Sequence, residues 1–217
     1  MANLITIARL LLVFVVIALV YEGGVTTITI CIPVIALIFA ADGLDGYVAR
    51  RRQSTSQFGS IFDIAGDRIV ENALWIAFAN LGLITVAAPL LVMTRGFIVD
   101  GIRSVSYAEG KTAFGKENMM RSDLTRWLTA GRFMRGLYGY AKALGFVFLT
   151  GLEGYRHRDA SGTLLGDVYG SDIVRAIGWI CVWGALALTV IRGLPVIVDA
   201  SSLWSKPPQP SAEQHAP

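Results

Sequence analysis

DGLDGYVARRRQSTSQFGSIFDIAGD, residues 42–67, is the stretch that decides the character of this chain. Within a sequence that is otherwise largely apolar, it holds four carboxylates: Asp42, Asp45, Asp63 and Asp67. Charged side chains are costly in apolar surroundings of the membrane type, and those that occur there mark functional sites. The stretch therefore predicts a functional site built from aspartates.

The spacing of the four aspartates predicts how they come together. Asp42 and Asp45 are three residues apart, and the second pair is four residues apart, so on helices each pair shares one face. Two helices that offer two carboxylates each form a cage of hard oxygen ligands, which suits Mg²⁺, Mn²⁺ or Ca²⁺.

The composition around this stretch is that of an integral membrane protein. Of the 217 residues, 54% are hydrophobic and 16% are charged, whereas soluble domains carry about 25% charged residues. The mean hydropathy is +0.56. The net charge of +3 suits contact with anionic headgroups and phosphorylated substrates, and no pattern of basic and aromatic residues points to nucleic acid.

Apolar runs predict an all-α integral membrane fold with six transmembrane helices, since a span needs about 20 mostly apolar residues. They favour one membrane domain over residues 1–200. The polar tail over residues 201–217 contains four prolines and is expected to be disordered. The six expected helices cover approximately residues 3–20, 26–48, 58–81, 84–108, 124–152 and 173–198.

Arginine and lysine in the short loops predict the orientation in the membrane. Residues 50–52 between the second and third helices are all arginine, and five basic residues lie at or between the fourth and fifth helices. The connections between the first two helices, and between the third and fourth, carry none. Both termini and the aspartates, at the ends of helices two and three, are therefore expected on the cytoplasmic side.

The pattern Asp42-x-x-Asp45-Gly46-x-x-Ala49-Arg50, eight residues, then Gly59-x-x-x-Asp63-x-x-x-Asp67 matches the signature of the CDP-alcohol phosphotransferase family. The chain resembles this family over about residues 3–200. The resemblance implies an integral membrane enzyme that transfers a phosphatidyl or related group from a CDP-linked donor to an alcohol and releases CMP.

The resemblance also implies roles for the signature residues. Asp42, Asp45 and Asp63 are the expected ligands of two divalent ions, Mg²⁺ or Mn²⁺, which would neutralise the pyrophosphate. Asp67 is the expected general base for the acceptor hydroxyl and is also expected to contact a metal ion.

Other signature positions are implied to bind CDP. Gly46, Ala49 and Gly59 would form the floor for the cytidine, and Arg50 would meet a donor phosphate. Asn3-x-x-Thr6-x-x-Arg9 is similar to an opening of the first helix in this family, which would turn Thr6 and Arg9 toward the site. A helix N-cap with a positive-inside charge explains these residues equally well.

Basic residues at membrane depth report on the acceptor. A neutral acceptor such as serine needs no cations, whereas a phosphorylated one is bound through paired guanidinium contacts, which favours glycerol 3-phosphate or an inositol phosphate. Single members of the set can also be snorkelling or positive-inside charges. The acceptor-phosphate candidates are Arg95, Arg103, Arg126, Arg132 and Arg135, and Lys142 lies on the same helices.

Details of the fourth and fifth helices bear on which alcohol is used. Thr94-Arg95 followed by Asp100-Gly101-Ile102-Arg103 resembles the phosphatidylglycerophosphate synthase branch, although Gly96 stands where that branch often has Glu. Residues 125–132 depart from the Gly-Lys-x-Lys-Thr-x-x-Gln of that branch, and Asp67-Arg68 is similar to relatives that use inositol phosphate. Glycerol 3-phosphate is preferred, with inositol phosphate or another alcohol as the alternative.

The expected partners are CDP-diacylglycerol from the bilayer, a small alcohol, membrane lipids and, by the resemblance, a second copy in a homodimer. The expected location is the bacterial inner membrane. A cation transporter could use the same carboxylates, but such sites lie near the midplane at broken helices, often between internal repeats. Here the aspartates fall at helix ends and no internal repeat is found.

Overall fold

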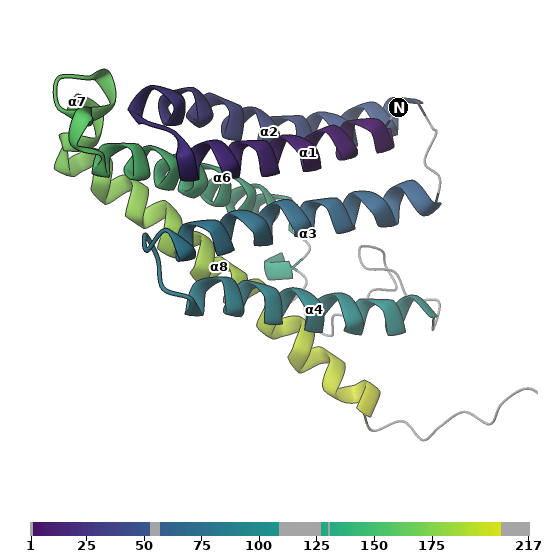
Figure 1. Ribbon diagram of the computed structural model, residues 1–217. Coiled ribbons are helices and arrows are strands. Elements are labelled where there is room, and N and C mark those ends of the chain that lie inside the picture. The colour runs from purple at the N-terminus through teal and green to yellow at the C-terminus, as the bar shows by residue number, and fades with distance from the viewer. Residues whose placement is uncertain (1, 53–56, 109–126, 130, 205–217) are drawn as a thin grey trace, which may run out of the picture.

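The computed structural model describes residues 2–52, 57–108, 127–129 and 131–204, and within these ranges every regular element is a helix. The chain is therefore all-α over its described part, as the sequence predicts (Figure 1). The long helices are α1 (Ala2–Glu22), α2 (Val25–Arg52), α3 (Gln57–Asn80), α4 (Ala87–Ala108), α6 (Arg132–Arg156) and α8 (Asp172–Trp204), and the short ones are η1 (Arg158–Ala160) and α7 (Leu164–Gly170).

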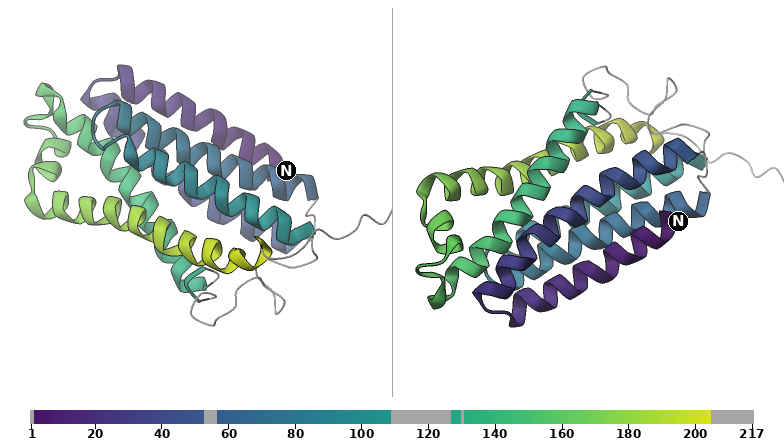
Figure 2. Two further views of the ribbon diagram at one scale, coloured as in Figure 1. Left: turned by 90° about the horizontal axis from the view of Figure 1, so that it is seen from below. Right: turned by 90° about the horizontal axis from the view of Figure 1, so that it is seen from above.

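The six long helices form a closed ring. Around the ring, α1 packs on α2, α2 on α6, α6 on α8, α8 on α4, α4 on α3, and α3 on α1. Figure 2 shows α1 to α4 running side by side, with α6 and α8 crossing them at an angle. A ring of this kind leaves each long helix one inward face, and this is where charged side chains can be shielded from lipid.

One end of the bundle collects the segments that the sequence assigns to the site. The N-terminus, the end of α2 and the start of α3 lie together, at the right of Figure 1. The opposite end is closed by tight turns. Gly82 has φ 72°, which a glycine adopts without strain, and its N–H donates to the carbonyl of Ala79 as α3 ends.

The packed core fills the part of the ring away from the aspartates. Phe146 of α6 is fully buried and lies against Phe39 of α2 and against Trp75 and Phe78 of α3. These aromatic contacts join helices from both sides of the ring, so the core fixes α6 relative to α3.

The connection between α6 and α8 carries the short helices, which the sequence does not predict. Thr163 caps α7 by accepting a hydrogen bond from the N–H of Gly166. Tyr169 donates from its hydroxyl to the carbonyl of Val147 at 3.4 Å, and burial raises the pKa of Tyr169 to about 12. This connection is therefore packed onto α6.

The helix boundaries differ from expectation at two places. The fifth helix is expected from about residue 124, but α6 begins at Arg132, because Gly131 has an extended ψ of 135° that separates α6 from a helical turn at residues 127–129. The last helix continues to Trp204, beyond the expected end near residue 198. The predicted loop over residues 110–123 and the tail from residue 205 lie outside the described residues.

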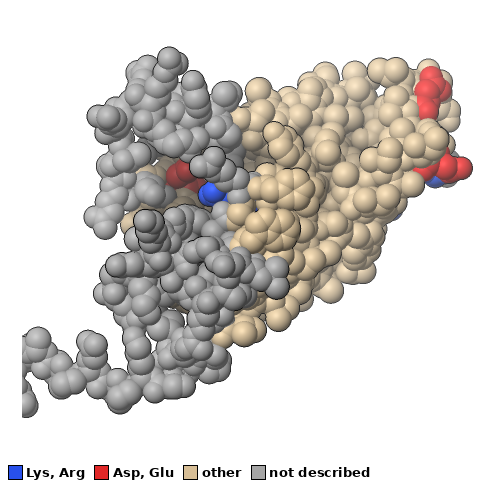
Figure 3. Space-filling view, turned by 180° about the vertical axis from the view of Figure 1, so that it is seen from behind, with Lys and Arg blue, Asp and Glu red and all other residues tan. Residues whose placement is uncertain are grey.

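Two helices in the described part are long and apolar enough to cross a membrane, judged by length and composition: residues Leu4–Glu22 and Asp172–Val198. In Figure 3 the middle of the visible face shows only uncharged residues, and the charged side chains lie toward the two ends. The outer faces of the helices also expose large apolar side chains, such as Leu11, Leu90 and Ile180. This distribution is the one expected for a protein surrounded by lipid.

Candidate functional site: acidic residues of α3 inside the helical ring

Three carboxylates lie one helical turn apart along α3. Asp63, Asp67 and Glu71 are spaced by four residues, so they share one face of the helix. Burial increases from Asp67 to Glu71: the side chain of Asp67 is 39% exposed and that of Glu71 is 4% exposed. The acidic face of α3 thus runs from the partly open end of the bundle into its interior.

Helix α1 holds the first two of these carboxylates. The hydroxyl of Thr6 donates to Asp63 Oδ1 at 3.5 Å, and Arg9 Nη2 donates to Asp67 Oδ1 at 3.0 Å. Both α1 side chains are buried. A charge-assisted contact of this length fixes the orientation of the Asp67 carboxylate.

Gly66 lets α1 approach this closely. A Cβ atom at Gly66 would lie 2.5 Å from Cγ2 of Thr6, a distance that real Cβ atoms essentially never show. The glycine lies between Asp63 and Asp67 in sequence, where the two helices meet. A side chain there would push Thr6 and Arg9 away from the carboxylates.

The other predicted metal ligands, Asp42 and Asp45, lie on α2 in its C-terminal half, but their side chains are outside the described residues. The same holds for Ala49 and Arg50, whereas Gly59 is half-buried in the first turn of α3. Among the described side chains, no group of three or more potential metal ligands converges. The described half of the predicted cage is Asp63 and Asp67, which supply only oxygen donors.

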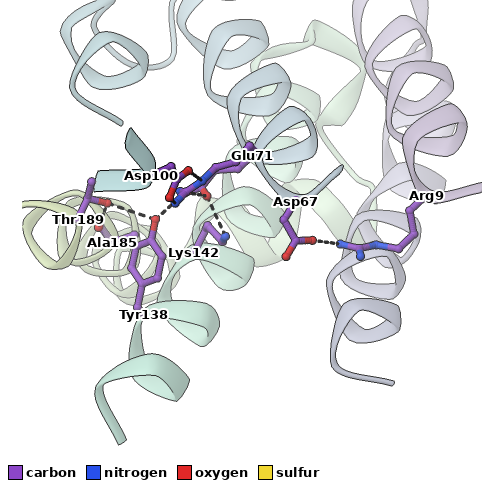
Figure 4. A network of polar contacts seen from close by, with 9 residues as sticks. Arg9, Asp67, Glu71, Asp100, Tyr138, Lys142, Ala185 and Thr189 are labelled. Carbon is purple, nitrogen blue, oxygen red and sulfur yellow. Dashed lines mark hydrogen bonds and ion pairs between the residues drawn. The ribbon is translucent and has the colours of Figure 1, made fainter. Parts of the chain in front are cut away.

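Deeper in the ring, Glu71 is the centre of a buried polar network (Figure 4). Its Oε1 accepts a hydrogen bond of 2.5 Å from the hydroxyl of Tyr138, and its Oε2 accepts one of 3.1 Å from Lys142 Nζ. Arg68 Nη1 lies 3.9 Å from the same carboxylate. Lys142 also interacts electrostatically with Asp67, so the network borders the α3 aspartates.

Arg68 extends the network to α4. It makes a two-pronged ion pair with Asp100, with Nε and Nη2 at 2.9 and 3.0 Å from the two carboxylate oxygens. The guanidinium passes beside Gly96, where a Cβ atom would lie 3.7 Å from Nη1. Arg68 therefore occupies the space beside the position at which this sequence departs from the phosphatidylglycerophosphate synthase pattern.

The candidate acceptor cations are spread over the ring. Arg95 of α4 lies across α8, where a Cβ atom at Gly193 would lie 2.7 Å from its Cγ. Arg135 is exposed on α6. Arg103 and Arg132 belong to α4 and α6, with side chains outside the described residues, and Arg126 is outside them altogether.

Sequence reasoning missed three residues of the interior. Glu71 and Tyr138 gave no motif, although Glu71 continues the four-residue spacing of the aspartates. Arg192 of α8 is 9% exposed, its guanidinium lies 5.1 Å from the centre of the Tyr138 ring, and its Nη2 donates to the Thr129 carbonyl at 3.2 Å. Arg192 could have been found, because it is a charged residue inside an apolar helix. The same criterion selected the candidate cations of α4 and α6.

The chain is similar to known enzymes over part of its length. It is 30% identical over 107 residues to the CDP-diacylglycerol–glycerol-3-phosphate 3-phosphatidyltransferase of Mycoplasma pneumoniae, covering 49% of this chain and 43% of that one. The enzyme of the same name from Rickettsia typhi is 29% identical over 101 residues, covering 46% and 57%. The phosphatidylinositol phosphate synthase of Mycobacterium marinum is 32% identical over 75 residues, covering 32% of each.

The alignments to the first two relatives therefore span about half of those proteins. A family model covers far more of the chain. Residues 1–191 match the model described as CDP-alcohol phosphatidyltransferase. This range includes all four aspartates, the whole of the α3 acidic face, and Thr6 and Arg9, which contact Asp63 and Asp67. With its signature intact and its full helical ring except the end of α8 inside that match, the chain belongs to the CDP-alcohol phosphatidyltransferase family.

Proposed function

We propose that this protein transfers a phosphatidyl group from CDP-diacylglycerol to an alcohol, with glycerol 3-phosphate as the preferred acceptor, and releases CMP. The observation that carries the proposal is the acidic face of α3. Asp63 and Asp67 lie at the end of the ring where the donor would enter, oriented by Thr6 and Arg9, within a chain that matches the family model over residues 1–191.

Two divalent ions, Mg²⁺ or Mn²⁺, fit the donor set. Asp42, Asp45, Asp63 and Asp67 supply carboxylate oxygens only, which is what these hard cations prefer. When bound, such ions would neutralise the pyrophosphate of the donor. The protein holds these carboxylates in position. Arg9, for example, donates to Oδ1 of Asp67 and so fixes one of its two oxygens.

Asp67 is the proposed general base. The acceptor hydroxyl oxygen forms a bond to the phosphorus that carries diacylglycerol, the bond from that phosphorus to the CMP oxygen breaks, and the hydroxyl proton passes to the Asp67 carboxylate. Arg9 orients this carboxylate through the 3.0 Å contact, which keeps an oxygen in place for the proton.

The CDP group would lie between α1, α2 and α3. Thr6, Gly46, Ala49, Arg50 and Gly59 are the proposed contacts, with the glycines and alanine leaving room for the nucleotide. The packing of α1 on both α2 and α3 supports this placement, because it brings the three helices that carry these residues together.

A phosphorylated acceptor is supported by the cations of the remaining helices. Arg95, Arg103, Arg126, Arg132 and Arg135 are the proposed phosphate contacts, and Arg192 joins them because it is a buried cation next to Gly193, against which Arg95 packs. The names of the relatives favour glycerol 3-phosphate first and inositol phosphate as the alternative.

In the membrane, the six long helices would each cross once, with both termini and the aspartate end in the cytoplasm. The loop charges favour this orientation, and the uncharged middle of the face seen in Figure 3 supports burial in lipid. The proposed location is a bacterial inner membrane, and the proposed assembly is a homodimer.

The test is CMP release by the purified protein with CDP-diacylglycerol and Mg²⁺ or Mn²⁺. Glycerol 3-phosphate, inositol 1-phosphate, free inositol and serine are supplied separately. We expect release with glycerol 3-phosphate and none with serine. Release with only one of the other acceptors would support the reaction and contradict glycerol 3-phosphate as the substrate. If folded protein releases no CMP with any of the four acceptors, the proposal is contradicted.

A further inference from the structure

Glu71 is a buried charge that the proposed chemistry does not use. It lies in the middle of α3, at a depth where an ionised group is costly, and it has three polar neighbours: Tyr138, Lys142 and Arg68. Arg68 is compensated by Asp100, and Lys142 is compensated by Glu71. Lys142 therefore does not need a bound anion as its partner. The Glu71–Lys142 ion pair connects α3 to α6.

Tyr138 connects the Glu71–Lys142 ion pair to a second cation, Arg192. Its hydroxyl donates to Glu71 at 2.5 Å, and the Thr189 hydroxyl lies 3.4 Å from it. Lys142 Nζ lies 5.2 Å from the centre of the Tyr138 ring, and the Arg192 guanidinium lies 5.1 Å from it. Contacts at these distances are favourable cation–π interactions, so the ring position helps to set where Arg192 lies.

Arg192 lies on the same helix as Gly193, over which Arg95 packs. It also donates to the carbonyl of Thr129, in the segment that precedes α6. The contacts thus run without a break from Glu71 of α3 through Tyr138 of α6 to Arg192 of α8 (Figure 4 shows the first part).

We propose that Glu71 is a positioning residue for the acceptor: its carboxylate fixes Tyr138 and Lys142, and through the Tyr138 ring it sets the Arg192 guanidinium that binds the acceptor phosphate. This inference rests on the proposed function. It assigns to Glu71 an effect on acceptor binding and none on CDP-diacylglycerol binding, because the CDP contacts lie on α1, α2 and the first turns of α3.

The experiment measures KM for glycerol 3-phosphate, KM for CDP-diacylglycerol and kcat in four single variants. Glu71→Gln removes the charge that holds Lys142, and Tyr138→Phe keeps the ring but removes its hydrogen bond to Glu71. The matched controls are Glu153→Gln, which breaks the ion pair with Arg156 near the opposite end of the bundle, and Tyr169→Phe, which removes the hydroxyl bonded to Val147.

We expect Glu71→Gln to raise the acceptor KM by about tenfold or more, the size expected for loss of a hydrogen bond to a charged group. Tyr138→Phe should raise it in the same direction. The KM for CDP-diacylglycerol should stay within about twofold in both, and both controls should keep all three constants. The double variant Glu71→Gln/Tyr138→Phe should raise the acceptor KM by less than the product of the two single effects, because both changes weaken the same contact between Glu71 and Tyr138.

A merely structural role for Glu71 would lower kcat and weaken both substrates together, and this result would overturn the inference. An unchanged acceptor KM in folded Glu71→Gln would also overturn the inference. The proposed function would still hold in that case, provided that the parent protein turns over normally. If the parent protein itself releases no CMP with any acceptor, the proposed function fails and this inference fails with it.

Discussion

At the scale of single residues, Asp67 is the position where orientation matters most. Arg9 reaches it from α1 with a 3.0 Å contact, although 58 residues separate the two in sequence. The common face of Asp63 and Asp67 on α3 could be predicted from their four-residue spacing, because helix periodicity alone places them there. The partner of each carboxylate could not be predicted, because it depends on which helices pack together.

Replacement of Asp67 by Asn removes the proposed base and keeps the shape of the side chain. We expect Asp67→Asn to lower CMP release by about 10²- to 10⁴-fold, the usual contribution of a general base. The control is Asp172→Asn, since the Asp172 side chain is 93% exposed at the start of α8. Near-normal turnover in folded Asp67→Asn protein would remove the assignment of Asp67 as the base.

Removal of divalent ions tests the carboxylate cage. Treatment with a chelator should abolish CMP release, and added Mg²⁺ or Mn²⁺ should restore it. Asp63→Asn should raise the metal concentration needed for half-maximal rate by about tenfold or more, because it removes one charged oxygen donor. Full activity after chelation would show that the aspartates act without a metal.

At the scale of elements, α3 carries most of the site and α1 fixes it. The apolar runs predict the long helices because each run is close to the length of a span. They do not predict the start of α6, since the break at Gly131 depends on one backbone angle, ψ 135°, in a sequence that is otherwise compatible with a helix. The apolar runs also do not predict the ion pair between Glu71 of α3 and Lys142 of α6, because the two residues lie 71 positions apart in sequence.

Gly66 offers a test of the α1–α3 contact. In Gly66→Ala the new Cβ would meet Thr6 at 2.5 Å, so we expect a loss of about 1–3 kcal/mol in stability, as for other overpacked sites. The measurement is thermal unfolding in detergent, together with CMP release, which should fall as Arg9 moves from Asp67.

The control for Gly66 is Gly184→Ala on α8, where nothing lies within 4 Å of the new Cβ. This variant should be neutral or more stable by up to about 1 kcal/mol, because alanine is the better helix former. Equal stability of the two alanine variants would contradict the close approach of α1 to α3.

At the scale of the whole molecule, the six long helices close into a ring, with the Glu71 network inside and large apolar side chains exposed on the outer faces. The middle of the face seen in Figure 3 is uncharged. The ring order α1–α2–α6–α8–α4–α3 is not contained in the order of the sequence. It follows from packing between distant segments, such as the Phe146 ring against Trp75 and Phe78. The all-helical class of the described residues could be predicted from the apolar runs, whereas this order could not.

The orientation in the membrane can be tested with single cysteines in a background that lacks Cys31 and Cys181. Ser104→Cys, exposed near the end of α4, should react with a membrane-impermeant maleimide only from the cytoplasmic side. Ser161→Cys, exposed in the connection that carries α7, should react only from the other side. Labelling of both from the same side would exclude the proposed topology.

The pairing of Arg68 with Asp100 has a consequence for biosynthesis. Helix α3 carries Asp63, Asp67, Arg68 and Glu71, and each charge near the centre of a helix adds about 2.5–3.5 kcal/mol to the cost of its transfer from the translocon into lipid. Helix α4 follows after the tight turn at Gly82 and brings Asp100 to Arg68. The two helices are therefore expected to leave the translocon together as a hairpin. The charges that form the site thus also determine that α3 enters the membrane with α4 and not alone.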